Sequence, residues 1–230
     1  MPVFRLSEQI EFPPPGLARS DGLLCVGGDL STERLIEAYK NGIFPWYAHN
    51  EPILWWTPDP RLILYPRDIR VSRSLAKRLR KNFFSVSMDT AFEEVVRNCA
   101  HTRTIHGEDT WLTSDMIQAY TRLHEAGRAH SVECWRNRRL AGGLYGVSLG
   151  GVFFGESMFT IITDASKVAL VHLARYLERL DYDLIDCQVA TDHMVSMGAV
   201  EIPRQLFLKK VRRSLEKPDR TFNWSFDDTE

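Results

Sequence analysis

Residues 129–160, AHSVECWRNRRLAGGLYGVSLGGVFFGESMFT, hold three largely apolar runs separated by two short links. The links, Asn137-Arg138 and Ser148-Leu149-Gly150, are polar or carry glycine and are short enough to join antiparallel neighbours. This stretch therefore predicts a three-stranded meander, with strands at about 129–136, 139–147 and 151–160.

Helices and one further strand are predicted around the meander. Helix caps and three- and four-residue apolar spacing place helices at about 32–41, 72–81, 91–99, 114–126, 165–180 and 203–215. The segment YDLIDCQV, residues 182–189, is predicted as a strand. The first sixty residues are rich in Pro and Gly, whereas regular elements dominate afterwards. We therefore predict an α+β fold, with a small N-terminal domain over 1–63 and a larger domain over 64–230.

The composition is that of a water-soluble globular protein. Its 29 basic and 30 acidic residues give a formal net charge of −1, and 44% hydrophobic residues suffice for a sizeable core. The four cysteines form no C-x-x-C pair, and no apolar run approaches the length of a membrane span. We expect a reduced, cytoplasmic protein without membrane association, and a monomer by default.

Polar side chains interrupt two of the predicted strands. Strand alternation places Glu156 on one face with Phe154 and Met158, and Asp186 on one face with Gln188. A carboxylate taken out of water is costly unless it is paired or hydrogen-bonded. Either Glu156 pairs with a structural Arg or Lys and Asp186 caps a loop, or the three groups meet in a catalytic or polar-ligand pocket.

A basic helix is compatible with a nucleic-acid partner. The helix predicted over 72–81 carries a stripe of four cations, Arg73, Lys77, Arg80 and Lys81. Three arginines precede it, Arg61, Arg67 and Arg70. A cluster of this density can follow a phosphate backbone, and a solvated helix face is the plain alternative.

Four tryptophans, Trp46, Trp55, Trp56 and Trp111, lie in segments with few other helix or strand signals. Large rings on loops either stack on nucleic-acid bases or anchor the seam between domains. We prefer the seam for Trp55 and Trp56.

Familiar cofactor and metal motifs are missing from the sequence. It contains no G-x-G-x-x-G, no P-loop and no H-E-x-x-H, and His101 and His106 have no Cys companions. A triad of Ser157, Asp192 and His193 lacks the G-x-S-x-G motif, and adjacent Asp and His side chains point apart on a strand. We therefore expect no metal, no cofactor and no serine-hydrolase chemistry.

A series of motifs between about Gly22 and Arg204 resembles one protein family. In chain order they are GGDLS, GIFPWY, LWWTPDPR, TWLT, AYTRLHEAGRAHSVECW, GGLYGV, GESMF, ASKVAL, LIDCQV and MGAVEIPR. The chain resembles the leucyl/phenylalanyl-tRNA–protein transferases. The resemblance implies a small N-terminal domain followed by a GNAT-like acyltransferase domain with a mostly antiparallel sheet flanked by helices.

The same resemblance implies an activity. Leu or Phe, and less well Met, would move from aminoacyl-tRNA to the N-terminal Arg or Lys of an acceptor protein and mark it for N-end-rule degradation. Gln188 would contact the attacking amine, and Asp186 would orient Gln188 and stabilise the positive charge that develops on nitrogen. Glu156 would hold a substrate amino group.

Two groups of residues would bind the donor. The resemblance assigns stacking on the terminal adenosine to Trp46, Trp111 and Tyr120, and the acceptor-stem backbone to the basic stripe. The pocket for the amino-acid side chain would draw on Leu144, Phe153, Met158, Leu170 and Ile185. Strand alternation turns Phe153 and Ile185 away from the face with Glu156 and Asp186 unless a bulge or splay intervenes. The chain has Leu144 and Thr191 where the family has Met and Asn.

Two other functions remain open from the sequence. An acetyl-CoA-dependent N-acetyltransferase would need an R/Q-x-x-G-x-G/A turn for pyrophosphate, and residues 139–144, RLAGGL, are a near miss. A non-catalytic tRNA-binding protein would use only the basic helix and the tryptophans. Peptidoglycan-building aminoacyl-tRNA ligases share the donor but are longer, with a duplicated core.

Overall fold

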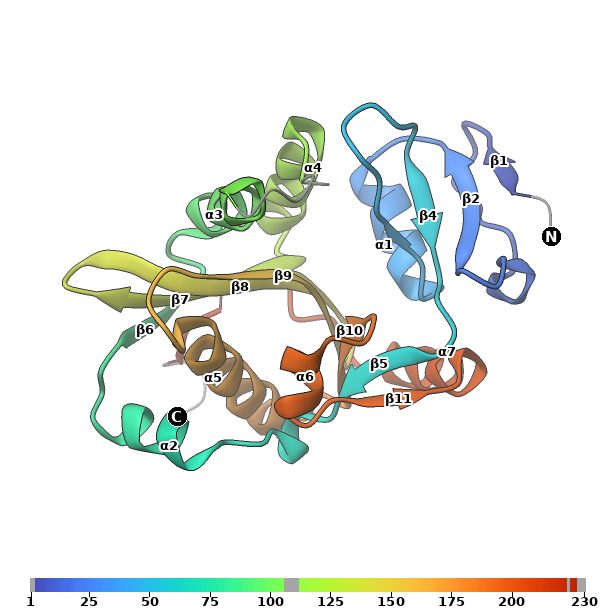
Figure 1. Cartoon of the computed structure of the whole chain (residues 1–230). Helices are drawn as coiled ribbons and strands as arrows, with labels where there is room; N and C mark the ends of the chain where they lie inside the picture. Colours follow the sequence, from blue (N-terminus) through green and yellow to red (C-terminus); the bar gives the residue numbers. More distant parts are fainter. Residues whose placement is uncertain (1–2, 106–111, 223, 227–230) are drawn as a thin grey trace.

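The computed structural model describes residues 3–105, 112–222 and 224–226 of the chain. Two β-sheets organise it (Figure 1). The first has the order β1-β2-β4-β3, with strands β1 (Phe4–Leu6), β2 (Leu23–Gly27), β3 (Phe44–Pro45) and β4 (Leu54–Trp56). The second has the order β11-β5-β10-β9-β8-β7-β6, with strands β5 (Arg61–Leu64), β6 (Ser85–Met88), β7 (Ala129–Arg136), β8 (Arg139–Leu149), β9 (Val152–Thr160), β10 (Leu184–Gln188) and β11 (Val200–Ile202).

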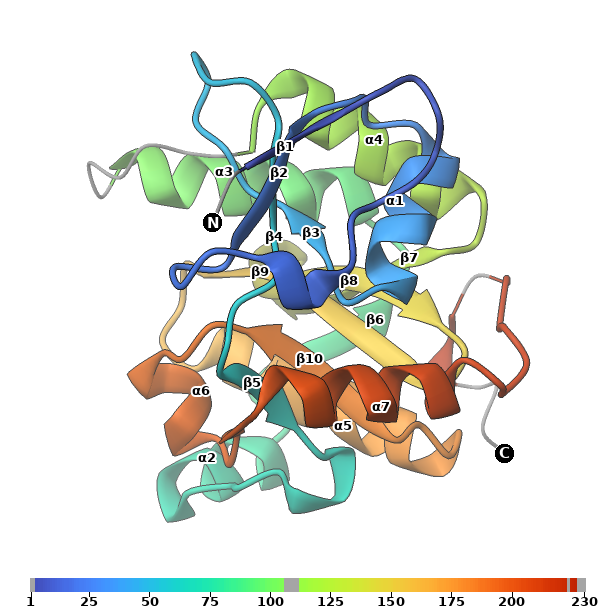
Figure 2. The same cartoon turned by 90° about the vertical axis from the view of Figure 1, so that its right-hand side faces the viewer.

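Helices cover both faces of the seven-stranded sheet (Figure 1). One face carries α3 (Phe92–Ile105) and α4 (Ser114–Glu125), and the opposite face carries α2 (Arg73–Arg80), α5 (Ala165–Arg179) and α6 (Asp192–Ser196). The helix α1 (Thr32–Lys40) packs in the small domain, and α7 (Arg204–Ser214) lies below that domain in Figure 2. Two short 3₁₀ helices complete the structure, η1 (Pro15–Leu17) and η2 (Pro66–Asp68).

The predicted meander is confirmed. The strands β7, β8 and β9 are consecutive antiparallel neighbours, and every other pairing in the large sheet is antiparallel except that of β9 with β10. Strand β8 runs to Leu149, so the link to β9 shrinks to Gly150 and Gly151. The fold class is therefore the one predicted, a small N-terminal domain followed by a larger α+β domain with a mostly antiparallel sheet flanked by helices.

The Pro- and Gly-rich start of the chain folds into more structure than predicted. Only its helix was expected, yet four short strands pair there, because runs of two to five residues carry no readable period. The indole of Trp55 donates to the Gly27 carbonyl at 2.8 Å, and that of Trp56 donates to the Trp46 carbonyl at 2.6 Å. These two rings, preferred above as seam anchors, hold the small sheet itself together.

One hydrophobic core runs through both domains. It includes Leu35 of α1, Trp55 of β4, Phe154 of β9 and Phe207 of α7, all of which are fully buried. A second cluster lies under α5 on the other face of the large sheet. The predicted domain boundary after residue 63 stays a prediction. It falls within the strand β5, which belongs to the large sheet.

Gly42 is a close contact between the two domains. It follows α1 with a φ of +68°, and a Cβ atom on it would lie 2.7 Å from Leu208 and 2.8 Å from Phe207. Gly42→Ala should therefore lower the free energy of unfolding by at least about 1 kcal/mol, the cost of a left-handed residue before any clash. Urea unfolding measures it.

The matched control is Gly16→Ala, where an added Cβ would meet nothing within 4 Å. This variant should keep or slightly raise the wild-type stability, because alanine restricts the unfolded chain. Equal stabilities for the two variants would contradict the role given to Gly42.

Candidate functional site

Glu156 sits in a β-bulge. Between Tyr145 and Gly146 of β8 the register with β9 skips one residue, and that residue is Glu156. The bulge reverses the alternation of side chains beyond it. Phe154 accordingly lies in the core on the α3 side, against the ring of Tyr39, whose hydroxyl contacts Glu156. Met158 instead packs on the α5 side. The predicted common face is thus correct for Phe154 and wrong for Met158.

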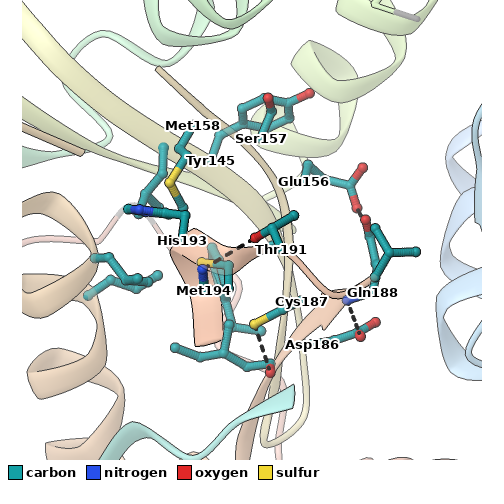
Figure 3. A pocket seen from close by; sticks show the side chains of 17 residues that line it. Tyr145, Glu156, Ser157, Met158, Asp186, Cys187, Gln188, Thr191, His193 and Met194 are labelled. Carbon is teal, nitrogen blue, oxygen red and sulfur yellow. Dashed lines mark hydrogen bonds between the residues drawn. The ribbon is translucent and has the colours of Figure 1, made fainter. Parts of the chain in front are cut away.

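Three side chains donate hydrogen bonds to the Glu156 carboxylate, which is 8% exposed. Figure 3 shows one of the three, Gln188, beside Glu156. The Tyr39 hydroxyl donates to Oε1 at 2.8 Å and the Tyr120 hydroxyl to Oε2 at 2.5 Å. Nε2 of Gln188 donates to Oε1 at 3.1 Å. Burial outweighs these bonds and, with the nearby charge of Asp186, raises the pKa of Glu156 from 4.5 to about 7.

The two tyrosines also touch each other, with their hydroxyl oxygens 2.7 Å apart. Glu156, Tyr39 and Tyr120 therefore form three close oxygen pairs, for which the two hydroxyls supply only two hydrogens. A proton on Glu156 fills the third pair. The geometry thus agrees with the raised pKa and favours the protonated carboxyl when no cation is bound.

Asp186 has a different partner, the buried Arg61. Nε and Nη2 of Arg61 donate to the two carboxylate oxygens at 2.8 and 2.6 Å, and both side chains are at most 1% exposed. The Arg61 guanidinium also lies over the rings of Phe44 and Phe207. Arg61 was expected in the basic surface cluster, and this is wrong because the strand β5 turns it inward.

The plain alternative is wrong for Glu156, whose partners are two tyrosines and a glutamine, and the structural arginine belongs to the other acid. Asp186, not Glu156, pairs with a structural arginine. Asp186 also accepts the backbone N–H of Gln188 at 3.0 Å, where the chain bends to a φ of +64° and the register with β5 shifts. The three polar groups meet, as predicted, but Asp186 holds the backbone that presents Gln188.

A pocket opens where β9 and β10 part. Their parallel pairing ends at Phe154 and Asp186, and beyond this point both strands bound an empty volume of about 810 Å³ that includes open solvent. All five residues predicted for the side-chain pocket line it, Leu144, Phe153, Met158, Leu170 and Ile185. Glu156 and Gln188 line the same pocket. Residues from opposite faces can share it because the strands separate, which resolves the conflict with strand alternation.

The helix α6 borders this pocket. The hydroxyl of Thr191 accepts the N–H of Met194 at 3.2 Å and caps the helix, a task that asparagine performs equally well. Asp192 and His193 were placed on a strand and lie instead in α6, and His193 lines the pocket.

The aromatic residues expected to stack on adenosine differ in their settings. Trp46 is 45% exposed, with its ring 5.8 Å from that of Trp56. Trp111 lies outside the described residues. The ring of Tyr120 is fully buried and offers no free face to a base, so the expectation for this residue is wrong. Its hydroxyl binds Glu156 because α4 packs directly over the sheet at this point.

The basic stripe lies on the surface, on the α5 side of the sheet. Its four cations, Arg73, Lys77, Arg80 and Lys81, are all exposed along α2. Arg78 of the same helix turns inward and pairs with Asp164 at 3.0 Å. The stripe is therefore free to meet a polyanion.

Sequence reasoning missed two residues of the site, Tyr39 and Arg61. Nothing in the amphipathic pattern of α1 separates Tyr39 from an ordinary core aromatic. Arg61 did carry a signal, because it begins the otherwise apolar run RLIL and an arginine there requires a buried acid.

Neither a metal site nor a membrane-spanning helix is found among residues 3–105, 112–222 and 224–226. No three His, Cys, Asp or Glu side chains come together there as metal ligands. Within these ranges, every helix is too short or too polar to cross a membrane.

The family models for this sequence cover most of the chain. Residues 63–212 match the model described as leucyl/phenylalanyl-tRNA protein transferase, and residues 28–59 match the model of its N-terminal domain. The chain belongs to this family. Leucyl/phenylalanyl-tRNA–protein transferases from Desulforapulum autotrophicum and Syntrophobacter fumaroxidans are 58% and 56% identical to it. The matches cover 98% and 97% of this chain and 99% and 96% of those proteins.

Solved structures resemble this family member more distantly. A conserved protein from Bacteroides thetaiotaomicron aligns with a TM-score of 0.44 at 12% identity, over 76% of this chain and 58% of that one. A GCN5-related N-acetyltransferase from Kribbella flavida aligns with a TM-score of 0.37 at 12% identity, over 74% and 59% of the two chains.

Glu156→Gln should change how stability depends on pH. Because the pKa of Glu156 rises from 4.5 to about 7 on folding, the folded protein keeps this proton at pH values where the unfolded chain has lost it. Through this group, the wild-type free energy of unfolding falls as pH increases from about 4.5 to about 7, by at most roughly 3 kcal/mol. Glutamine mimics the protonated acid and does not titrate, so the variant should escape the fall.

The measurement is urea unfolding of both proteins at several pH values between about 5 and about 8. The difference between the two profiles isolates Glu156 from the other titrating groups. Parallel profiles would show that the carboxyl is ionised throughout this range.

Asp186→Ala should damage the fold, because it leaves the Arg61 guanidinium buried and unpaired. We expect a loss of about 3–5 kcal/mol in the free energy of unfolding. The control is Asp21→Ala, which breaks a pair with Arg19 whose side chains are both 45% exposed and should cost under about 1 kcal/mol. Similar small losses in both variants would mean that the buried pair is not structural.

Proposed function

We propose that this protein transfers Leu or Phe, and less well Met, from aminoacyl-tRNA to the N-terminal Arg or Lys of acceptor proteins. It would act in the cytoplasm as a monomer, without a cofactor, and would mark its acceptors for N-end-rule degradation. One observation carries the proposal beyond family membership. A pocket with an apolar wall has Glu156 and Gln188 at one side, a combination that suits an amino acid with an apolar side chain and a free amino group.

The apolar wall would select the donor. Leu144, Phe153, Leu170 and Ile185 are each at most 3% exposed, so the pocket wall is fixed by packing and not by mobile surface groups. A β-branched side chain such as that of Val would fill it poorly. One methylene changes discrimination in such a pocket by only about 1–3 kcal/mol, so several apolar side chains of similar size would be accepted.

The reaction itself needs little activation of the nucleophile. An α-amino group has a pKa of about 7.7–8.0 and is partly neutral at pH 7. Its nitrogen bonds to the ester carbonyl carbon, the bond from that carbon to the ribose oxygen breaks, and the ribose oxygen takes up a proton. Positioning of amine and ester can supply on the order of 7–11 kcal/mol of the lowered barrier.

Glu156 is the carboxylate suited to hold a substrate ammonium group and to take up the proton that nitrogen loses. Its pKa of about 7 lies close to the pH of the reaction. Asp186 is less suited, because its charge is already paired with the buried guanidinium of Arg61. We therefore assign Asp186 the task of orienting Gln188 through its backbone N–H, and Gln188 the contact with the attacking amine.

The tRNA would bind through sequence-independent contacts. The exposed ring of Trp46 offers a stacking surface for the terminal adenosine, and Trp111 keeps the same proposed role. The stripe on α2, Arg73 to Lys81, would follow the acceptor-stem phosphates. Such contacts read charge and stacking, so the donor amino acid and not the tRNA sequence would decide selection.

Residues 139–144, the near miss for a pyrophosphate turn, lie within β8 and pair with β7 and β9. The geometry at the start of α5 also argues against acetyl-CoA as donor. A pyrophosphate would need free N–H groups at this helix end. The N–H of Ala165 instead donates to the Ile162 carbonyl at 3.0 Å, and that of Ser166 to the Thr160 hydroxyl at 3.4 Å.

A direct transfer assay tests the proposal. The protein is mixed with tRNA charged with Leu, Phe or Val and with two peptides that differ only in a free or an acetylated N-terminal Arg. We expect extension of the free peptide alone, by Leu or Phe and not by Val, without added cofactor. Mass spectrometry of the peptides gives the readout.

Glu156→Gln serves as the matched variant because it keeps the shape and the hydrogen bonds of the protonated side chain. It should fold and bind tRNA but transfer at least about a hundredfold more slowly, as expected for loss of acid–base catalysis. Wild-type transfer rates in the variant would refute the role of Glu156. Tight tRNA binding by a wild-type protein that extends no peptide would favour a non-catalytic tRNA-binding protein.

A further inference from the structure

The C-terminal segment inserts a tryptophan into the large domain. Trp224 lies twelve positions beyond residue 212, where the family match ends, and its side chain is 1% exposed. Its backbone N–H donates to Asp89 at 2.7 Å. Its ring stacks on the His130 ring with centroids 3.8 Å apart and planes 5° apart. The segment is therefore docked at a defined place.

Other contacts hold the segment on its way to this site. Asp219 accepts the backbone N–H of Gly150 at 2.8 Å and pairs with Arg128. Arg220 donates to the Leu180 carbonyl at 3.1 Å. These contacts tie the path after α7 to the β8–β9 turn and to the end of α5, so the position of Trp224 is supported from several elements.

Trp224 lies directly behind the amino-acid pocket. The rings of Trp224 and Phe153 have centroids 5.8 Å apart, within the range of aromatic contact. Phe153 lines the pocket with Leu170 and Ile185. On the remaining sides Trp224 meets Tyr176 at 5.2 Å and Tyr182 at 6.0 Å. The pocket wall at Phe153 is thus one ring thick, with Trp224 as its backing.

The ring of Phe153 is confined by Gly146 as well. A Cβ atom on Gly146 would lie 2.6 Å from Cε1 of Phe153, so the ring already fills the space over this glycine. Motion of Phe153 toward the backbone of β8 is blocked, and motion away from the pocket is blocked by Trp224. The depth of the pocket therefore depends on a residue that does not line it.

We propose that Trp224 is a specificity-determining positioning residue, which fixes the Phe153 wall and thereby limits the size of the amino-acid side chain that the pocket accepts. The inference rests on the transfer activity proposed above. If Trp224 is shortened, the Phe153 ring can retreat into the vacated space and the pocket deepens. Larger donors then gain relative to Leu.

The test compares donors on the same enzyme. The ratio of kcat/KM for Phe-tRNA to that for Leu-tRNA is measured for wild type, Trp224→Phe, Trp224→Ala and the control Phe222→Ala, whose side chain is 45% exposed. We expect the ratio to rise by about tenfold in Trp224→Ala, the effect of about one methylene in an apolar pocket. Trp224→Phe should give a smaller rise, and the control should match wild type.

A ratio is chosen because partial unfolding lowers both rates equally and leaves it unchanged. Unchanged ratios in both Trp224 variants would show that Trp224 only stabilises the fold, and would overturn the inference. If Trp224→Ala does not fold, the outcome rests on Trp224→Phe, with the same two readings. Absence of transfer by wild type would instead overturn the proposed function, and this inference with it.

Discussion

A buried carboxylate with three donors connects the parts of this molecule. Glu156 stands on the central strand β9 and receives hydrogen bonds from Tyr39 of α1, Tyr120 of α4 and Gln188 of β10. These donors come from the small domain, a covering helix and the neighbouring strand. A carboxyl in such surroundings costs free energy when it is ionised unless hydrogen bonds or a cationic partner offset the cost. The hydrogen bonds of Glu156 therefore constrain both how the domains pack and which polar groups face the pocket.

The same region shows how a continuous sheet provides a site. Parallel pairing between β9 and β10 lasts for three residue pairs and then stops. The bulge at Glu156 and the left-handed backbone of Gln188 occur just beyond this point, one on each strand. Both irregularities turn polar side chains toward the gap while the flanking apolar residues remain in the core. Regular strands would have buried one set and exposed the other.

Sequence patterns predicted the meander and the helix after it, because these depend on short-range period and turn chemistry. The five apolar residues of the pocket came from the family resemblance, since strand alternation alone would have turned two of them, Phe153 and Ile185, away. Sequence patterns also brought Glu156, Asp186 and Gln188 together. They could not show which acid is neutralised, since Arg61 lies 125 positions from Asp186 and only the path of β5 brings it inward. Tyr120 was misplaced for a similar reason: burial of an aromatic ring is decided by the helix above it. The short strands of the small domain leave no periodic signal at all.

The link between Tyr39 and Glu156 spans 117 positions of the chain and crosses from one domain to the other. Local opening of a small, loop-rich unit costs less free energy than global unfolding. When the small domain undocks, Glu156 loses one of its three donors while the seven-stranded sheet keeps its pairing. The hydrogen bonds of Glu156 are therefore complete only while the small domain is docked, so the protonation of this carboxyl reports on domain docking.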